Sequence, residues 1–377
     1  MAGIYIHIPF CKQACFYCDF HFSTSLKKKD ELIGCLIKEI EIRKDELDNA
    51  TIETIYFGGG TPSILSTQEI NRLIEAVYSN FKVVDHPEIT LEANPDDLSE
   101  DKIIELSKSA INRLSIGVQS FFEHDLKLMN RAHNSLEAKA SIALATQYFK
   151  NISVDLIYGI PDCTNEQWRE NIQTALSFNV PHISSYALTV EPKTALASFI
   201  KKGIIKNVDD EKAEEQFLIL IDELEKADFV HYETSNFGKK GFFSKNNTAY
   251  WLRKSFLGIG PSAHSFDGKQ RSWNVRNNAK YIKSIQQNLL PLERETLSNT
   301  DRYNEYIMTG LRTIWGISLK KVFTDFGNTY LQYLEKQSKK YIDQELLYIE
   351  NGILRTTQKG KFLSDGIASD LFILNLV

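Results

Sequence analysis

The sequence lacks a surplus of basic residues and any long apolar run. Lys and Arg number 44 against 49 Asp and Glu, which gives a net charge of -5. A general nucleic-acid binder needs the opposite balance to displace counterions from phosphates. No stretch approaches the roughly 18 consecutive apolar residues of a membrane span, and no secretory signal opens the chain. We therefore expect a cytoplasmic protein that neither spans a membrane nor binds nucleic acid.

Cysteine is also scarce, with five in 377 residues. This number is too small for a disulfide framework in a chain of this length. Three of the five, Cys11, Cys15 and Cys18, nevertheless fall within eight residues. Such clustering is typical of metal ligation.

The first half of the sequence alternates short β-branched runs with longer amphipathic stretches. This pattern is typical of repeated strand–helix units around a parallel sheet. It favours a partial or complete β/α barrel, although periodicity alone is also compatible with an open doubly wound sheet. In either fold, chemistry gathers where the strands end. The predicted strands are residues 4–8, 54–57, 88–92, 113–118, 152–158 and 182–189.

The chain is long enough for more than one domain. We expect a barrel core over residues 1–205 and an extension that covers the barrel over 206–296. A charged helix over 209–226, followed by a polar loop through 247, belongs to this extension. Residues 297–377 read as a small, mostly helical C-terminal domain with a hairpin near 347–355.

The three clustered cysteines follow the first predicted strand. A four-iron cluster normally takes four cysteines, so three ligands leave one iron open to an external group. The amino and carboxylate groups of S-adenosylmethionine are suited to that position. The alternative is a structural zinc site made of the three cysteines and His21.

Polar and glycine residues recur at the ends of the other strands. Gly58-Gly59-Gly60-Thr61-Pro62 follows the second strand, where a backbone without β-carbons allows a ligand close approach to N–H and C=O groups. The next three strands carry Glu92, Gln119 and Asp155. Buried polar groups need partners. One small zwitterionic ligand with ribose hydroxyls would satisfy them together, whereas otherwise each needs a separate protein partner.

Several segments resemble the radical S-adenosylmethionine (radical SAM) proteins, in the branch that contains oxygen-independent coproporphyrinogen III oxidase and the HemW-type heme chaperones. The resemblance runs nearly the full length of the chain. The matching segments are YIHIPFC at 5–11, GGGTPS at 58–63, LEANP at 91–95, RLSIGVQSF at 113–121, NRAH at 130–133 and DLIYGIP at 155–161.

This resemblance implies a partial (β/α)6 radical-SAM-type barrel and a [4Fe–4S] cluster on Cys11, Cys15 and Cys18. It also implies that Arg131 pairs with the methionine carboxylate and that Glu92 and the glycine-run backbone bind the ammonium group. The residues assigned to S-adenosylmethionine are Tyr5, Tyr17, Gly59, Gly60, Thr61, Glu92, Gln119, Arg131, Asp155 and Ala187.

Two features favour the chaperone over the oxidase. Asp19-Phe20 follows the third cysteine, whereas the oxidase pattern has a further cysteine two positions after the third. The sequence also begins ten residues before Cys11, without the N-terminal extension of the oxidase. We therefore expect a protein that binds heme and transfers it to an acceptor, with a reductant if the cluster is redox-active. The alternative is an oxidase that cleaves S-adenosylmethionine and acts on a porphyrinogen, so the sequence leaves enzymatic activity open.

The segment Asn246-Asn247-Thr248-Ala249-Tyr250-Trp251 resembles a heme-chaperone motif that reads His-Asn-x-x-Tyr-Trp. Here asparagine replaces the histidine, and an amide is no ordinary heme-iron ligand. Asn247, Tyr250 and Trp251 are expected at the porphyrin, with the two rings packed against it. The alternative is a surface loop anchored by two aromatics. His264 and His231 are candidate iron ligands, each with a hydrogen-bonded structural histidine as its alternative.

Overall fold

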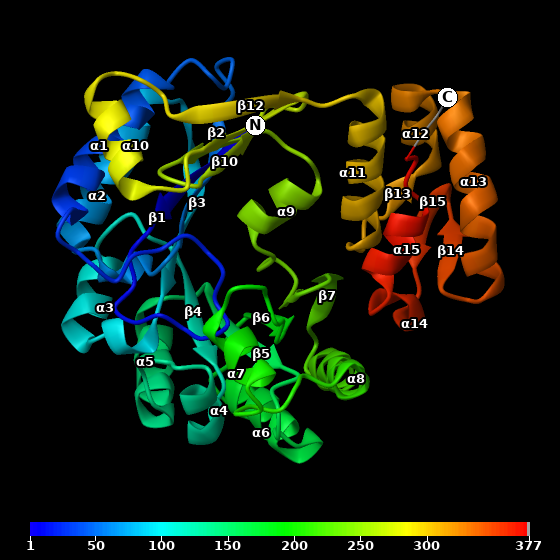
Figure 1. The fold of residues 1–377 in the computed structure, drawn as a ribbon, viewed down its shortest axis with the longest axis horizontal. Helices are drawn as coiled ribbons and strands as arrows, with labels where there is room; N and C mark the ends of the chain where they lie inside the picture. Colours follow the sequence, from blue (N-terminus) through cyan, green and yellow to red (C-terminus); the bar gives the residue numbers. More distant parts are fainter. Residues whose placement is uncertain (375–377) are drawn as a thin grey trace.

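Six parallel strands form the centre of a twelve-stranded sheet in the computed structural model, which describes residues 1–374 (Figure 1). They lie side by side in chain order and confirm the six predicted strands. The curved sheet also confirms the expected partial barrel. The strands are β1 (Ala2–Ile8), β2 (Ile52–Gly59), β3 (Val83–Ala93), β4 (Arg113–Gln119), β5 (Ile152–Tyr158) and β6 (His182–Ala187).

Helices cover the outer face of this sheet, and successive side chains of a strand point to its two faces. On β4, Leu114, Ile116 and Val118 are buried against the helices, while Ser115 and Gln119 face the barrel interior. Ser66 is the N-cap of α2 and forms a capping box with Glu69. The helices are α1 (Lys29–Ile42), α2 (Thr67–Asn80), α3 (Glu100–Ser107), α4 (Glu123–Leu128), α5 (Ser135–Tyr148) and α6 (Asn165–Ser177), with short 3-10 turns η1 (Pro62–Ile64) and η2 (Pro95–Asp97).

Residues after β6 widen the sheet at both edges. The hairpin of β7 and β8 pairs with β6, and β9 pairs parallel to β1. The predicted helix over 209–226 is confirmed as α8. The elements are α7 (Ala195–Lys201), α8 (Asp210–Lys226), β7 (Val230–Glu233), β8 (Asn236–Gly238), α9 (Lys245–Trp251), β9 (Phe256–Ile259), β10 (His264–Phe266), β11 (Gln270–Asn274), α10 (Asn278–Gln286) and β12 (Leu292–Thr296).

The polar stretch through residue 247 is therefore no loop, and that prediction was wrong. Its polar side chains bond inside the protein: Asn236 accepts from the Ser184 hydroxyl at 2.7 Å, and Asn246 accepts from the Thr54 hydroxyl at 3.1 Å. Because β8 lies beyond β6 and β9 lies beyond β1, the chain between them crosses the open side of the barrel. It carries α9 into the concave side of the sheet (Figure 1).

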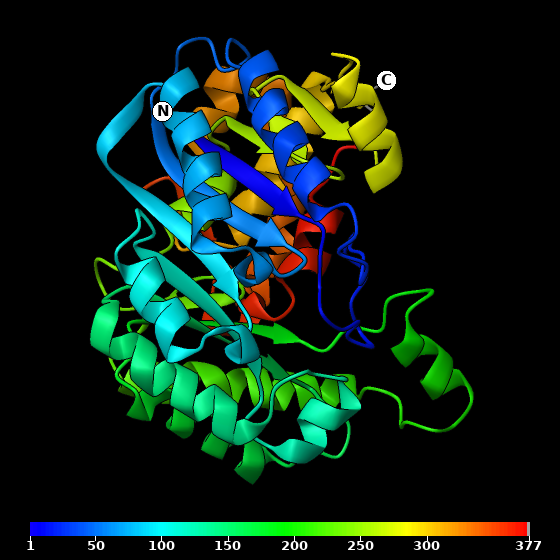
Figure 2. The same cartoon turned by 90° about the vertical axis from the view of Figure 1, so that its left-hand side faces the viewer.

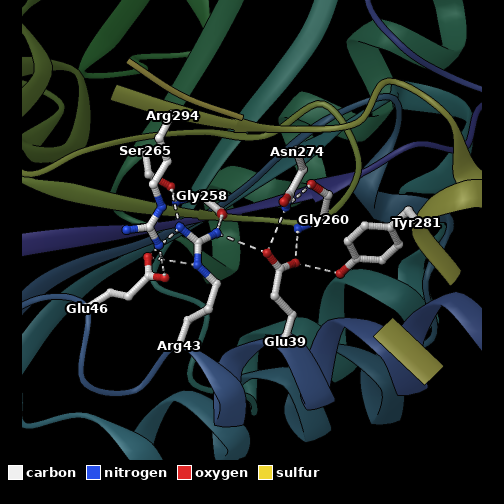
Figure 3. A network of polar contacts seen from close by, with 9 residues as sticks. All are labelled: Glu39, Arg43, Glu46, Gly258, Gly260, Ser265, Asn274, Tyr281 and Arg294. Carbon is white, nitrogen blue, oxygen red and sulfur yellow. Dashed lines mark hydrogen bonds and ion pairs between the residues drawn. The ribbon is translucent and has the colours of Figure 1, made fainter. Parts of the chain in front are cut away.

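A buried polar network joins α1 to the added strands (Figure 3). The side chains of Glu39 and Arg43 are 0% and 1% exposed and pair at 3.0 Å. Arg43 also donates to the Gly258 carbonyl at 2.8 Å, and Glu39 accepts from the Tyr281 hydroxyl at 2.6 Å. Asn274 donates to Glu39 at 2.7 Å. These bonds fix β9, β11 and α10 against the barrel.

The C-terminal part has a separate hydrophobic core, built around Tyr303, Ile307 and Leu334. The predicted hairpin is confirmed as β14 and β15, whereas the three-part division of the chain stays a prediction. Residues 375–377 lie outside the described residues. None of the described helices combines the length and apolar composition needed to cross a bilayer. The elements are α11 (Asn299–Leu311), β13 (Ile317–Ser318), α12 (Leu319–Phe326), α13 (Asn328–Asp343), β14 (Leu347–Glu350), β15 (Ile353–Thr356), α14 (Gln358–Lys361) and α15 (Ser364–Asp370).

Candidate functional site

The loop that carries Cys11, Cys15 and Cys18 begins where β1 ends. All three thiols are free and half-buried. The segment after α4 holds this loop from one side: the Phe16 amide donates to the Met129 carbonyl at 3.1 Å, and the Asn130 side chain donates to the Ala14 carbonyl at 2.8 Å. The cysteine loop is thus shaped by residues more than a hundred positions away in the sequence.

The glycine run after β2 holds the loop from the other side. The Gly60 amide donates to the Ile8 carbonyl at 2.9 Å, and the Thr61 amide donates to the Phe10 carbonyl at 2.7 Å. A β-carbon on Gly60 would lie 2.6 Å from the Phe10 oxygen, so only glycine permits this approach. We expected these N–H groups to contact a ligand. The structure corrects this, because the amides of Gly60 and Thr61 already donate hydrogen bonds to carbonyl groups of the protein. The carbonyl oxygens of the run are the groups that suit a cationic ligand.

Arg131 lies half-buried between the ends of β3 and β4 and the cysteine loop. Its Nη2 donates to the Gly117 carbonyl at 2.7 Å and to Asn94 Oδ1 at 2.8 Å, and its Nη1 lies 3.2 Å from Cys15 Sγ. Its Nε atom is shielded from water and has no partner among residues 1–374. A shielded donor without a partner is unusual in a protein. It therefore fits a site for an anionic ligand group, as the methionine carboxylate requires.

Glu92 at the end of β3 points toward the glycine run. It accepts from the Tyr56 hydroxyl at 2.8 Å and from the Gly59 amide at 3.2 Å. Loss of water around the carboxylate raises the pKa of Glu92 to about 7, and the nearby Asp155 also raises it. The ring of Tyr5 stacks on Tyr56 at 6.1 Å between centroids. A cationic group bound here would stabilise the ionised form of Glu92.

The remaining predicted ligands lie on β4, β5 and β6 and in the cysteine loop. Gln119 ends β4 with a φ of +71°, a left-handed conformation that an ordinary residue seldom adopts. Asp155 on β5 accepts hydrogen bonds of 3.1 Å from Ser115 and Ser153. Tyr17 lies in the cysteine loop, and Ala187 ends β6. The sheet brings these residues to one mouth, and their individual contacts with a ligand stay predictions.

The zinc alternative requires His21 to face the thiols. Instead, His21 Nε2 bonds with Asn278 Oδ1 at 2.7 Å, and its ring stacks on His7 at 6.3 Å. Within residues 1–374, no three His, Cys, Asp or Glu side chains converge as ligands of one metal ion. In a cubane each cysteine binds a different iron, so the cysteines need not converge on one point. Without such a convergence, the residues that the structure describes give no support to the zinc alternative.

Three residues with no predicted role in the site also contribute to it. Asn94 accepts from Arg131, His133 bonds with the Val118 carbonyl at 3.0 Å, and Tyr56 donates to Glu92. The segments 91–95 and 130–133 contain the first two, so a signal existed for them. Tyr56 sits two positions before the glycine run on the inner face of β2, a place that only the sheet register shows.

The segment expected to pack against a porphyrin forms α9 and makes several contacts within the protein. Asn246 is 2% exposed, and its backbone N–H donates to the Glu88 carboxylate at 3.1 Å. The Ser244 side chain caps α9 by accepting a hydrogen bond from the backbone N–H of Asn247 at 3.2 Å. The ring of Tyr250 packs edge-on against Phe256 at 4.5 Å, and Arg312 covers Trp251 at 5.4 Å. Each ring thus has one neighbour within the protein and remains partly exposed, so contact of this segment with a porphyrin stays a prediction.

The two candidate histidines differ. His231 is buried, stacks on Phe237 at 4.1 Å, and bonds through Nε2 to the Thr234 carbonyl and through Nδ1 to Lys361. Both ring nitrogens are engaged, so His231 is corrected to a structural histidine. His264 is exposed at the start of β10, with its ring 6.0 Å from that of Trp273.

Comparison with known proteins agrees with this site. The model of the radical SAM superfamily matches residues 5–175, and that of the HemN C-terminal domain matches 297–363. The heme chaperone HemW of Lactococcus lactis is 34% identical, over 96% of this chain and 95% of the relative. The HemW of Bacillus subtilis is 32% identical, over 97% and 98%.

A solved structure of coproporphyrinogen III oxidase (HemN) from Escherichia coli has the same fold. Its TM-score is 0.86 at 22% identity, over 98% of this chain and 90% of that one. The superfamily match implies the two expected cofactors, a [4Fe–4S] cluster and S-adenosylmethionine. Because the similarity to the curated relatives spans nearly the whole chain, the protein belongs to the HemW heme chaperone family of the radical SAM superfamily.

Proposed function

We propose that this protein binds heme and passes it to an acceptor protein. The observation that carries the proposal is the near full-length similarity to relatives named as heme chaperones. Phe20 supports it, because this residue stands where the oxidase pattern places a further cysteine. The proposal places the protein in the cytoplasm, where thiols stay reduced, since all five cysteines are free. A reductant is needed only if the cluster changes its redox state.

The mouth of the barrel is the proposed site for the two cofactors. Cys11, Cys15 and Cys18 would hold the cluster, which when bound supplies an iron with an open coordination position. The free Nε–H of Arg131 would donate to the carboxylate of S-adenosylmethionine. Glu92 and the glycine-run carbonyls would accept from its ammonium group. Arg131 also fixes Cys15, so cluster and ligand share one positioning side chain.

Binding of S-adenosylmethionine should strengthen between pH 5.5 and 7. Glu92 has a pKa near 7, so it is mostly neutral at pH 5.5 and gains its charge as the pH rises. The ligand's ammonium stays charged over this range. The affinity should therefore increase by up to about tenfold per pH unit. Equilibrium dialysis of the cluster-loaded protein at several pH values measures it.

A Glu92→Gln variant separates this effect from others. It should bind S-adenosylmethionine at least about tenfold more weakly at pH 7 and show a flat profile below that pH. Glu41→Gln, on the exposed face of α1, is the matched control and should keep the parent profile. A Glu92→Gln variant with the parent slope would remove Glu92 from the ligand site.

Heme handling is tested directly on the reconstituted protein. Titration with hemin under anaerobic conditions should shift the Soret band, and the heme should then move to an apo-hemoprotein acceptor. In a parallel reaction, coproporphyrinogen III, S-adenosylmethionine and a reductant should give no divinyl product. An unchanged Soret band would contradict heme binding, and formation of the divinyl product would assign the protein to oxidase chemistry.

A further inference from the structure

A pocket of 810 Å³ opens at the edge of the barrel mouth. Because β9 runs parallel to β1, the turn after β9 lies at the same end of the sheet as the cysteine loop. His264 follows this turn, and Trp273 lies opposite it on β11. Figure 2 shows α10, in yellow, and the loop after β1, in dark blue, on the same side of the molecule. The lining residues include Ser262, His264, Trp273, Arg276, Lys280 and Lys283.

Two contacts join Arg276, which lines the pocket, and the nearby Asn278 to the segment that follows Cys18. Arg276 donates to the Asp19 carbonyl, and His21 Nε2 bonds with Asn278 Oδ1 at 2.7 Å. Between Asp19 and His21 stands Phe20, which is 72% exposed. Phe20 thus leaves an apolar ring at the surface of the segment that makes these contacts. The pocket and the cluster loop therefore form one continuous edge of the mouth.

The pocket combines three kinds of group that suit an iron porphyrin: an imidazole, apolar surface and basic side chains. An exposed imidazole and an indole lie together, with ring centroids 6.0 Å apart. Val275, Leu290 and Pro291 add apolar surface. Arg276, Lys280 and Lys283 place positive charge in the lining, which also contains Glu293. Partial burial and the nearby Arg271 lower the pKa of His264, which favours the neutral imidazole that binds metals.

We propose that this pocket binds heme. His264 would ligate the iron, and Lys280 and Lys283 would pair with the two propionates. The indole of Trp273 is tilted by 31° from the imidazole, so it would contact the porphyrin edge-on. The proposal rests on the proposed function and names the site where it takes place. It places the iron ligand outside residues 246–251, because Asn246 stands where the heme-chaperone motif has its histidine.

The test uses the full-length, cluster-loaded protein and two probes. Hemin carries iron, whereas protoporphyrin IX has the same ring and propionates without it. His264→Ala should weaken hemin binding at least about tenfold and change the Soret position, while protoporphyrin IX binding stays near the parent value. Lys280→Glu with Lys283→Glu should weaken both probes about tenfold, and less at high salt. His86→Ala, an exposed histidine on β3, is the control and should match the parent.

The outcomes separate the site from the function. If the parent protein binds no hemin, the proposed function fails and the site fails with it. If the parent binds hemin and His264→Ala gives the same spectrum and affinity, the site is overturned and the function stands. Iron content and circular dichroism equal to those of the parent confirm that each variant is folded. His264 is exposed, so its replacement removes no core packing.

Discussion

Replacing Cys11, Cys15 and Cys18 with alanine will reduce the iron content of anaerobically reconstituted protein from about four atoms per chain to near zero. Each thiolate binds one iron of the cubane, so loss of all three removes its attachment. The loop itself should persist, because backbone bonds to Met129, Ser23 and Phe10 hold it. Iron and sulfide analysis with the absorbance near 400 nm measures the effect.

The control for this variant is Cys35→Ala with Cys163→Ala. Both cysteines are buried, Cys35 on α1 and Cys163 before α6. They lie outside the cysteine loop, so the control should keep the full iron content and the parent spectrum. Substantial iron in the triple variant, or its loss in the control, would contradict the cluster assignment.

Replacing Arg43 with methionine should lower the free energy of unfolding by about 3–5 kcal/mol. The change leaves Glu39 fully buried without its opposite charge, although Tyr281, Asn274 and the Gly260 amide still donate to it. Methionine also leaves the Gly258 carbonyl without its Arg43 donor. Urea unfolding followed by circular dichroism measures the change.

Two further variants make this result specific. Glu39→Gln in the Arg43→Met background removes the unpaired charge and should recover part of the loss. Arg294→Met breaks the half-exposed pair with Glu46 and should cost less than about 1 kcal/mol. Equal losses for Arg43→Met and Arg294→Met would show that burial of the network does not contribute as argued. Both variants keep the cysteine loop, so their iron content should match the parent.

Much of the barrel was predictable because its signals are local. The β-branched runs of the strands, the three-to-four spacing on the helices and the Ser66 capping box each involve residues that are close together in the chain. The three cysteines likewise carry their ligand pattern in eight consecutive residues. Short segments that resemble the family then marked most residues at the strand ends.

Other features depended on contacts between distant residues. The Arg131 bond to Cys15 joins positions 116 apart, and the bond of His21 to Asn278 joins positions 257 apart. The stretch after residue 226 through residue 247 was predicted as a polar loop, because its hydrogen-bond partners Ser184 and Thr54 lie on strands far earlier in the chain. The strand pairing decides which polar residues find a partner inside the protein.

The sequence by itself determined the strand–helix order, the cysteine ligand pattern and the family. Only the tertiary structure decided how the histidines and glycines are used. It engaged both nitrogens of His231 and left His264 exposed beside Trp273, and it turned the glycine-run amides toward Ile8 and Phe10. The physical reason is that the periodicity of a segment depends on residues close together in the chain. The hydrogen-bond partners of a side chain depend instead on the packing of elements far apart in the sequence.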